Sequence, residues 1–145
     1  MSKKSYLYLD DCRCPIDSEW VVVKDYDEFV KYVEEQGLEN IQRISLDHDL
    51  GKSAMNEYFT NTYSNGFINY DNIEEKTGMD VCKYLVKKSI ETKIPLPLIT
   101  VHSHNPIGRK NMKSYINSYL KYMELDQTCV DQFFQFILDK NYEDY

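Results

Sequence analysis

Acidic and imidazole side chains gather at three places where an apolar run of the chain ends. In chain order these places are Asp10-Asp11, Asp47-His48-Asp49 and His102-Ser103-His104-Asn105. Carboxylates are ligands that Mg²⁺ and Mn²⁺ prefer, and histidine is the side chain best suited to move a proton near neutral pH. If the apolar runs are strands of one parallel sheet, their carboxyl ends meet at one edge and these groups form a single site.

The aspartates predict a divalent metal site. Asp47 and Asp49 lie two residues apart, so their side chains point the same way in an extended chain. With Asp10 and Asp11 they suggest Mg²⁺ or Mn²⁺, and the nearby imidazoles leave another divalent metal such as Fe²⁺ or Zn²⁺ open. Any one of these aspartates alone is adequately explained as a loop former. Their recurrence at two strand ends favours the metal.

Candidate catalytic residues are His48, His102 and Asp47. His48 stands between two candidate ligands, and His102 ends a run that reads as a central strand. His104 is not counted among these candidates. Asp47 is either a metal ligand or a nucleophile, and Asp49 is either a further ligand or the group that orients His48.

A candidate anion site follows the last apolar run. Asn105 and Pro106 are typical of the cap and first residue of a helix, whose free N–H groups attract phosphate. Ser103, Asn105 and Arg109 are therefore candidate substrate-binding residues, although a plain capping segment explains them equally well. Arg13 is a further anion contact or an internal counterion of the aspartates.

Composition narrows the class of protein. A chain of 145 residues fits one domain, here 1–145. The net charge of −7 without a basic stripe argues against duplex DNA as a partner. The four cysteines show no disulfide framework. No signal segment or membrane span is recognisable, so we expect a cytoplasmic protein that does not bind membranes.

Hydrophobic periodicity predicts alternating strands and helices. Strands are expected over 5–9, 20–23, 41–46 and 98–101, and helices over about 26–36, 78–92, 106–120 and 126–139. No helix is expected between the first two strands, where Pro15 stands. This order predicts an α/β fold with a mainly parallel sheet of four or five strands and helices on both faces.

An insertion of about residues 52–76 interrupts the pattern. Asparagines alternate there with aromatic residues, and the Asn65-Gly66 pair predicts a type I′ hairpin; a mobile loop is the alternative. Such an insertion beside an active edge serves as a lid, a recognition loop or an interface for a protein partner.

Taken together, these segments resemble a known family, the cyclic-phosphate-processing receiver-like domain, over about residues 6–120. The matching motifs are Tyr8-Leu9-Asp10-Asp11-Cys12-Arg13-Cys14-Pro15, Trp20, Ile44-Ser45-Leu46-Asp47-His48-Asp49-Leu50-Gly51, Thr77-Gly78-Met79-Asp80-Val81 and Val101-His102-Ser103-His104-Asn105-Pro106-Ile107-Gly108-Arg109. The resemblance implies a receiver or flavodoxin-like fold, Mg²⁺ held by Asp10, Asp11 and Asp47, and Ser103 at the hydroxyl position of receivers. The essential lysine of a receiver has no counterpart.

The predicted function is a divalent-metal-dependent phosphoesterase that processes a cyclic phosphate, either an RNA 2′,3′-cyclic end or a cyclic nucleotide messenger. Two alternatives come from other classes. One is a non-catalytic module that binds or sequesters a nucleotide, and the other is a receiver-like module for protein interaction.

Overall fold

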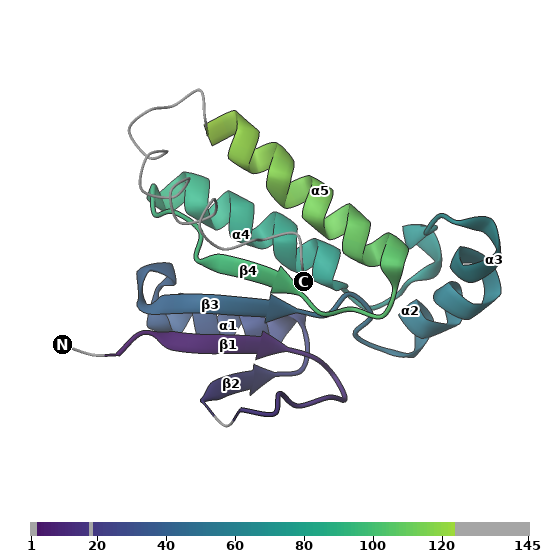
Figure 1. Cartoon of the computed structure of the whole chain (residues 1–145), viewed down its shortest axis with the longest axis horizontal. Helices are drawn as coiled ribbons and strands as arrows, with labels where there is room; N and C mark the ends of the chain where they lie inside the picture. The colour runs from purple at the N-terminus through teal and green to yellow at the C-terminus, as the bar shows by residue number, and fades with distance from the viewer. Residues whose placement is uncertain (1–2, 18, 124–145) are drawn as a thin grey trace.

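Four parallel strands form the centre of the molecule. The computed structural model describes residues 3–17 and 19–123, and its sheet has the strand order β2-β1-β3-β4 (Figure 1). The strands are β1 (Ser5–Leu9), β2 (Trp20–Val23), β3 (Ile41–Leu46) and β4 (Leu98–Val101). The predicted parallel sheet of a receiver-like α/β fold is confirmed.

Register aligns the apolar side chains of neighbouring strands on one face. Leu9 pairs with Val23 on one side and with Leu46 on the other, and Leu46 pairs with Val101. All four side chains are buried in one continuous core. Because the strands keep this register to their last residues, the segments that follow them start at the same edge of the sheet.

Three long helices pack on that core. They are α1 (Tyr26–Gln36), α4 (Gly78–Thr92) and α5 (Pro106–Met123). The side chain of Asp25 caps α1, and Gly37 ends it with φ 85°. Thr77 and Asp80 form a reciprocal capping box at the start of α4, which satisfies N–H groups that would otherwise lack partners. These starts and stops agree with the sequence analysis.

The second face of the sheet is lined by aromatic side chains. Tyr6 and Tyr8 of β1 pack against Trp20 of β2, with ring centroids 5.3 and 5.9 Å apart. The segment 10–19 contains Pro15 and forms no helix over this face in the part that the structure describes. Within that part, the long helices lie on the Leu9 face and along the β4 edge, so cover by helices on both faces is not observed there.

The insertion is helical, and the predicted hairpin is wrong. It consists of α2 (Lys52–Glu57), a π-helical turn η2 (Tyr58–Thr62), α3 (Tyr63–Asn65) and a 3₁₀ turn η3 (Tyr70–Asn72). Figure 1 shows it beyond the carboxyl ends of the strands. Gly66 has φ 77° at the end of α3. A helix stop and a type I′ turn both use a left-handed residue, so the Asn65-Gly66 pair is compatible with either structure.

A buried carboxylate holds the insertion together. Glu57 is 3% exposed and accepts hydrogen bonds from the side chain of Asn61, the backbone N–H of Asn69 and the side chain of Asn72. Three asparagines of the insertion therefore serve as donors to one acceptor. Such bonds between positions 4 to 15 residues apart do not show in a local pattern.

The predicted C-terminal helix of about 126–139 lies outside the described residues. Short connections complete the fold, including the 3₁₀ turn η1 (Leu38–Asn40) before β3. Among the helices that the structure describes, none is long and apolar enough to cross a membrane.

Gly78 provides a test of how tightly β3 and α4 are joined. Its N–H donates to the carbonyl oxygen of His48, and a Cβ at this position would lie 2.0 Å from the carbonyl oxygen of Asp47. We expect Gly78→Ala to lower the free energy of unfolding by about 2–3 kcal/mol, measured by urea denaturation. Gly66→Asn is the control, because a Cβ at Gly66 meets nothing within 4 Å and asparagine tolerates a positive φ. Equal stability of the two variants would contradict the tight junction.

Candidate active site

The sheet brings Asp10, Asp47 and His102 to one edge. Each residue directly follows its strand and continues the ladder by one bond: Asp10 N–H donates to Val23, Asp47 N–H to Leu9, and His102 N–H to Leu46. The three backbone positions are therefore fixed by the sheet and not by flexible loops. This is the gathering of strand ends on which the predicted site depends.

Arg13 bridges the two aspartates. Its Nε lies 2.8 Å from Asp10 Oδ2, and its Nη2 lies 3.3 Å from Asp47 Oδ1. Arg13 is thus an internal counterion, one of the two roles expected for it, and its side chain remains 34% exposed. Because part of the guanidinium is exposed, it can also bind an anion.

Asp10 is a saturated acceptor. Its Oδ1 accepts from the backbone N–H groups of Cys12 and Arg13, while its Oδ2 accepts from Arg13 Nε and His102 Nε2. Burial alone would raise the pKa of this carboxyl, but the two backbone bonds and the bond from His102 outweigh it, so the pKa of Asp10 is lowered. Asp10 is ionised at neutral pH.

Asp47 has the opposite environment. It is 5% exposed, its Oδ1 accepts from the N–H of His48, and no donor among the described residues bonds its Oδ2. Burial, followed by the negative charge of Asp10, raises the pKa of Asp47 to about 6. A carboxyl group that titrates this close to neutral pH can accept and release a proton during a reaction.

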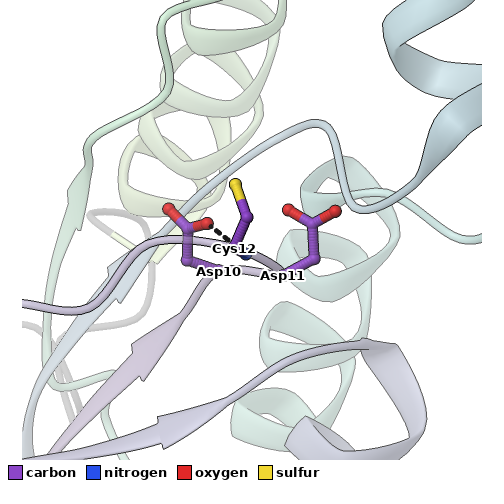
Figure 2. Close-up of side chains that lie close together, drawn as sticks. All are labelled: Asp10, Asp11 and Cys12. Atoms are coloured by element: carbon purple, nitrogen blue, oxygen red, sulfur yellow. Dashed lines mark hydrogen bonds between the residues drawn. The ribbon is translucent and has the colours of Figure 1, made fainter.

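Asp10, Asp11 and Cys12 project to the same side of the loop after β1 (Figure 2). One ligand atom from each lies within 4.8 Å of the others. Burial and the charge of Asp10 raise the pKa of Asp11. Among the described residues, this group does not include Asp47 or Asp49, the other two predicted ligands, and Asp47 is linked to Asp10 through Arg13. The oxygen-rich, under-neutralised donor set fits a hard divalent cation, although a cation bound to Asp10 has to compete with four donors.

His102 is oriented on both sides of its ring. Nδ1 lies 2.7 Å from Ser45 Oγ, Nε2 lies 3.0 Å from Asp10 Oδ2, and the ring stacks on Tyr8 at a centroid distance of 4.3 Å. Burial lowers the pKa of His102 despite the nearby Asp10. The neutral ring therefore donates from Nε2 to the ionised Asp10 and accepts at Nδ1 from Ser45.

His48 is fully buried and held by the elements around it. Its Nδ1 lies 2.6 Å from Asp49 Oδ1, and its Nε2 lies 3.0 Å from the hydroxyl of Tyr70 in the insertion. A Cβ on Gly108 would lie 2.5 Å from the ring, so this glycine admits the imidazole against α5. The hydrogen bond from Nδ1 to Asp49 lets this carboxylate orient the ring, which is one of the two roles that the sequence left open for Asp49.

The turn before α5 supplies polar groups. Asn105 caps the helix through a bond from Gly108 N–H to its Oδ1, and its amide contacts both oxygens of Asp49. Ser103 Oγ accepts from the N–H of Asn105, which leaves the hydroxyl proton for another acceptor. Arg109 instead donates to the carbonyl oxygen of Ser103, 3.0 Å away, and does not line the cavity described next.

A cavity of about 230 Å³ lies at this edge. The predicted site residues that line it are Arg13, Asp47, Asp49, Ser103 and Asn105. His104, which was not among the candidates, lines it, whereas His48 and His102 do not.

The cavity also has a wall that the sequence analysis missed. Met55, Tyr58 and Phe59 of the insertion line it, together with Cys12. Their spacing of three and four residues places Met55 with Tyr58 and Phe59 on one side of a helix. That signal is readable only once the insertion is known to be helical.

Comparison with known proteins agrees with this architecture. The family described as the cyclic-phosphate processing receiver domain matches residues 5–118. The chain belongs to this family. No curated protein and no solved structure gives a significant match. Membership links the chain to cyclic-phosphate processing and to the receiver-like domain predicted from its motifs.

The raised pKa of Asp47 predicts that this residue reduces stability. The folded protein holds the Asp47 proton more tightly than the unfolded chain does. The stability that comes from this bound proton is therefore lost as the pH rises from about 4 through 6. We expect Asp47→Asn, measured in chelator at pH 7.5, to raise the free energy of unfolding by about 1–2 kcal/mol. The gain should disappear near pH 4.

Asp17→Asn is the matched control, because Asp17 is exposed and, within the part of the chain that the structure describes, bonds only the backbone N–H of Glu19. Its effect should be small at both pH values. An Asp47→Asn variant that is less stable than the parent at pH 7.5 would show that the Arg13 contact outweighs the cost of burial.

Proposed function

We propose that this protein is a divalent-metal-dependent phosphoesterase that hydrolyses a cyclic phosphate, either a 2′,3′-cyclic RNA end or a cyclic nucleotide. One observation carries the proposal: Arg13 and the near-neutral carboxyl of Asp47 face the same cavity as the start of α5. A phosphate diester needs a cation for its oxygens and a group that takes a proton from water. Both stand at this edge.

Phosphate binding falls to three groups. Arg13 offers the exposed part of its guanidinium, and Ser103 offers its hydroxyl proton. The N-terminus of α5 adds the positive end of the helix dipole. These donors are held in place before substrate arrives, so they stabilise charge that develops on the non-bridging oxygens.

The proposed reaction transfers one proton from the attacking water to the protein and one proton from the protein to the leaving oxygen. A water oxygen attacks phosphorus, its proton passes to Asp47, and one ring P–O bond breaks. The departing oxygen takes a proton from His104, which alone among the three histidines lines the cavity. The product is a phosphomonoester. His102 holds Asp10, and His48 holds Asp49, so both act as positioning residues.

A divalent cation held by Asp10, Asp11 and the cavity-facing Asp47 or Asp49 would neutralise phosphate charge and lower the pKa of a bound water. Mg²⁺ and Mn²⁺ suit these oxygen ligands. Arg13 shares Asp10 and Asp47 with that position. Cation binding should therefore weaken the contacts of Arg13 with Asp10 and Asp47.

The decisive assay incubates the protein with cyclic nucleotides and cyclic-ended RNA, with and without Mg²⁺ or Mn²⁺, and detects phosphomonoesters by mass. Asp47→Asn should lower kcat/KM by about 10²–10⁴-fold because the proton acceptor is lost. Since the same change should stabilise the fold, the loss cannot arise from unfolding. Asp17→Asn should retain full activity.

Other outcomes identify the alternatives. Nucleotide binding without turnover across the panel would favour a sequestering module and overturn the enzyme. The absence of both binding and turnover would favour a protein-interaction module. Equal activity of Asp47→Asn and the parent would remove Asp47 from the mechanism.

The pKa of Asp47 also predicts the pH profile. The reaction requires the ionised Asp47 carboxylate, so the acid limb of the kcat/KM profile should have its midpoint near pH 6 at low metal concentration. A bound cation stabilises the ionised form, so higher Mg²⁺ concentrations should move this midpoint to lower pH. The measurement is kcat/KM from pH 5 to 8 at several Mg²⁺ concentrations. A midpoint that does not respond to Mg²⁺ would place the cation away from Asp47.

A further inference from the structure

Large apolar side chains are exposed where the insertion borders the cavity. Met55 is 47% exposed and Phe59 is 65% exposed, and Tyr63 and Phe67 of the same insertion are more than half exposed. Single exposed apolar residues need no explanation, but a group beside a cavity indicates a binding surface. Of this group, Met55 and Phe59 line the cavity.

The rings near the cavity are held in a fixed arrangement. Tyr58 meets Phe59 edge to face at 5.3 Å and Tyr63 at 6.2 Å. The helix that carries them is fixed by Glu57 and by Glu75, which binds Ser53 and the backbone N–H of Ala54. The insertion is therefore a rigid wall, and an exposed ring on a rigid wall loses little entropy on binding.

One cavity thus has two chemically different sides. Arg13, Asp47, Asp49, Ser103 and Asn105 form a polar side, and Met55, Tyr58 and Phe59 form an apolar side. A phosphate alone would use only the polar side. A ligand that fills both has a phosphate at one end and a flat apolar group at the other.

We propose that Phe59, supported by Met55 and Tyr58, binds the base of a single cyclic nucleotide by stacking. This inference rests on the proposed function, because the polar side has to hold the cyclic phosphate. Every base offers a π-face, so stacking on an aromatic ring gives affinity with little preference among bases. The insertion therefore selects nucleotides over cyclic phosphates that lack a base.

A single nucleotide fits the site better than RNA does. The cavity of about 230 Å³ is smaller than the roughly 300–1,000 Å³ of sites for drug-sized ligands. The chain carries a net charge of −7, and a polynucleotide backbone needs a basic track. A compact nucleotide brings one phosphate, which Arg13 can neutralise.

The test compares Phe59→Ala with Phe67→Ala. Phe67 is an aromatic residue of the same insertion, 55% exposed, and does not line the cavity. The substrates are adenosine 2′,3′-cyclic phosphate and glycerol 1,2-cyclic phosphate, which has no base. We expect Phe59→Ala to lower the ratio of kcat/KM, nucleotide over base-free, by about ten- to a hundredfold. Phe67→Ala should leave this ratio unchanged.

Calorimetric binding of the same nucleotide separates this inference from the proposed function. Binding of the nucleotide that depends on Phe59, without any turnover, would support the base subsite and overturn the proposed phosphoesterase activity. Turnover with equal ratios for both variants overturns the base subsite and keeps the enzyme. Tighter, salt-dependent binding of a cyclic-ended RNA oligomer than of the mononucleotide would overturn the choice of a single nucleotide.

Discussion

A single guanidinium balances two buried carboxylates at the carboxyl edge of the sheet, and the properties of the site follow from that imbalance. Arg13 binds Asp10 and Asp47 together, but backbone donors converge on Asp10 and leave Asp47 under-neutralised. The pKa of Asp10 is therefore lowered, while that of Asp47 is raised to about 6. Neighbouring acids whose pKa values are pushed apart in this way can take different parts in one reaction.

Buried histidines keep this arrangement in place. His102, which follows β4, connects to Asp10 directly after β1 and to Ser45 of β3, so the three strand ends are linked through side chains as well as backbone. His48 connects Asp49 to Tyr70 of the insertion. Because both nitrogens of each ring are hydrogen-bonded, these rings fix the positions of the carboxylates that they contact.

Local pattern was enough to locate the sheet, the long helices and the residues at the strand ends. It was not enough for the insertion, since Asn65-Gly66 satisfies a hairpin turn and a helix stop equally well. The choice is made by Glu57, whose buried carboxylate collects donors as far away as Asn72. Likewise, the position of Arg13 between two aspartates depends on strand register, and the irregular segment after β4, which includes His104, has no regular period from which side-chain directions can be predicted.

In the proposed function, the two sides of the cavity separate chemistry from recognition. The polar side comes from strand ends and from the start of α5, where backbone bonds of the sheet and a helix cap fix each group. The apolar side comes from the insertion, which is tied to its own carboxylates, Glu57 and Glu75. Residues on the outer face of the insertion can therefore change without moving Asp47 or Arg13. A scaffold of this kind can keep one reaction while the group that it recognises beside the phosphate varies.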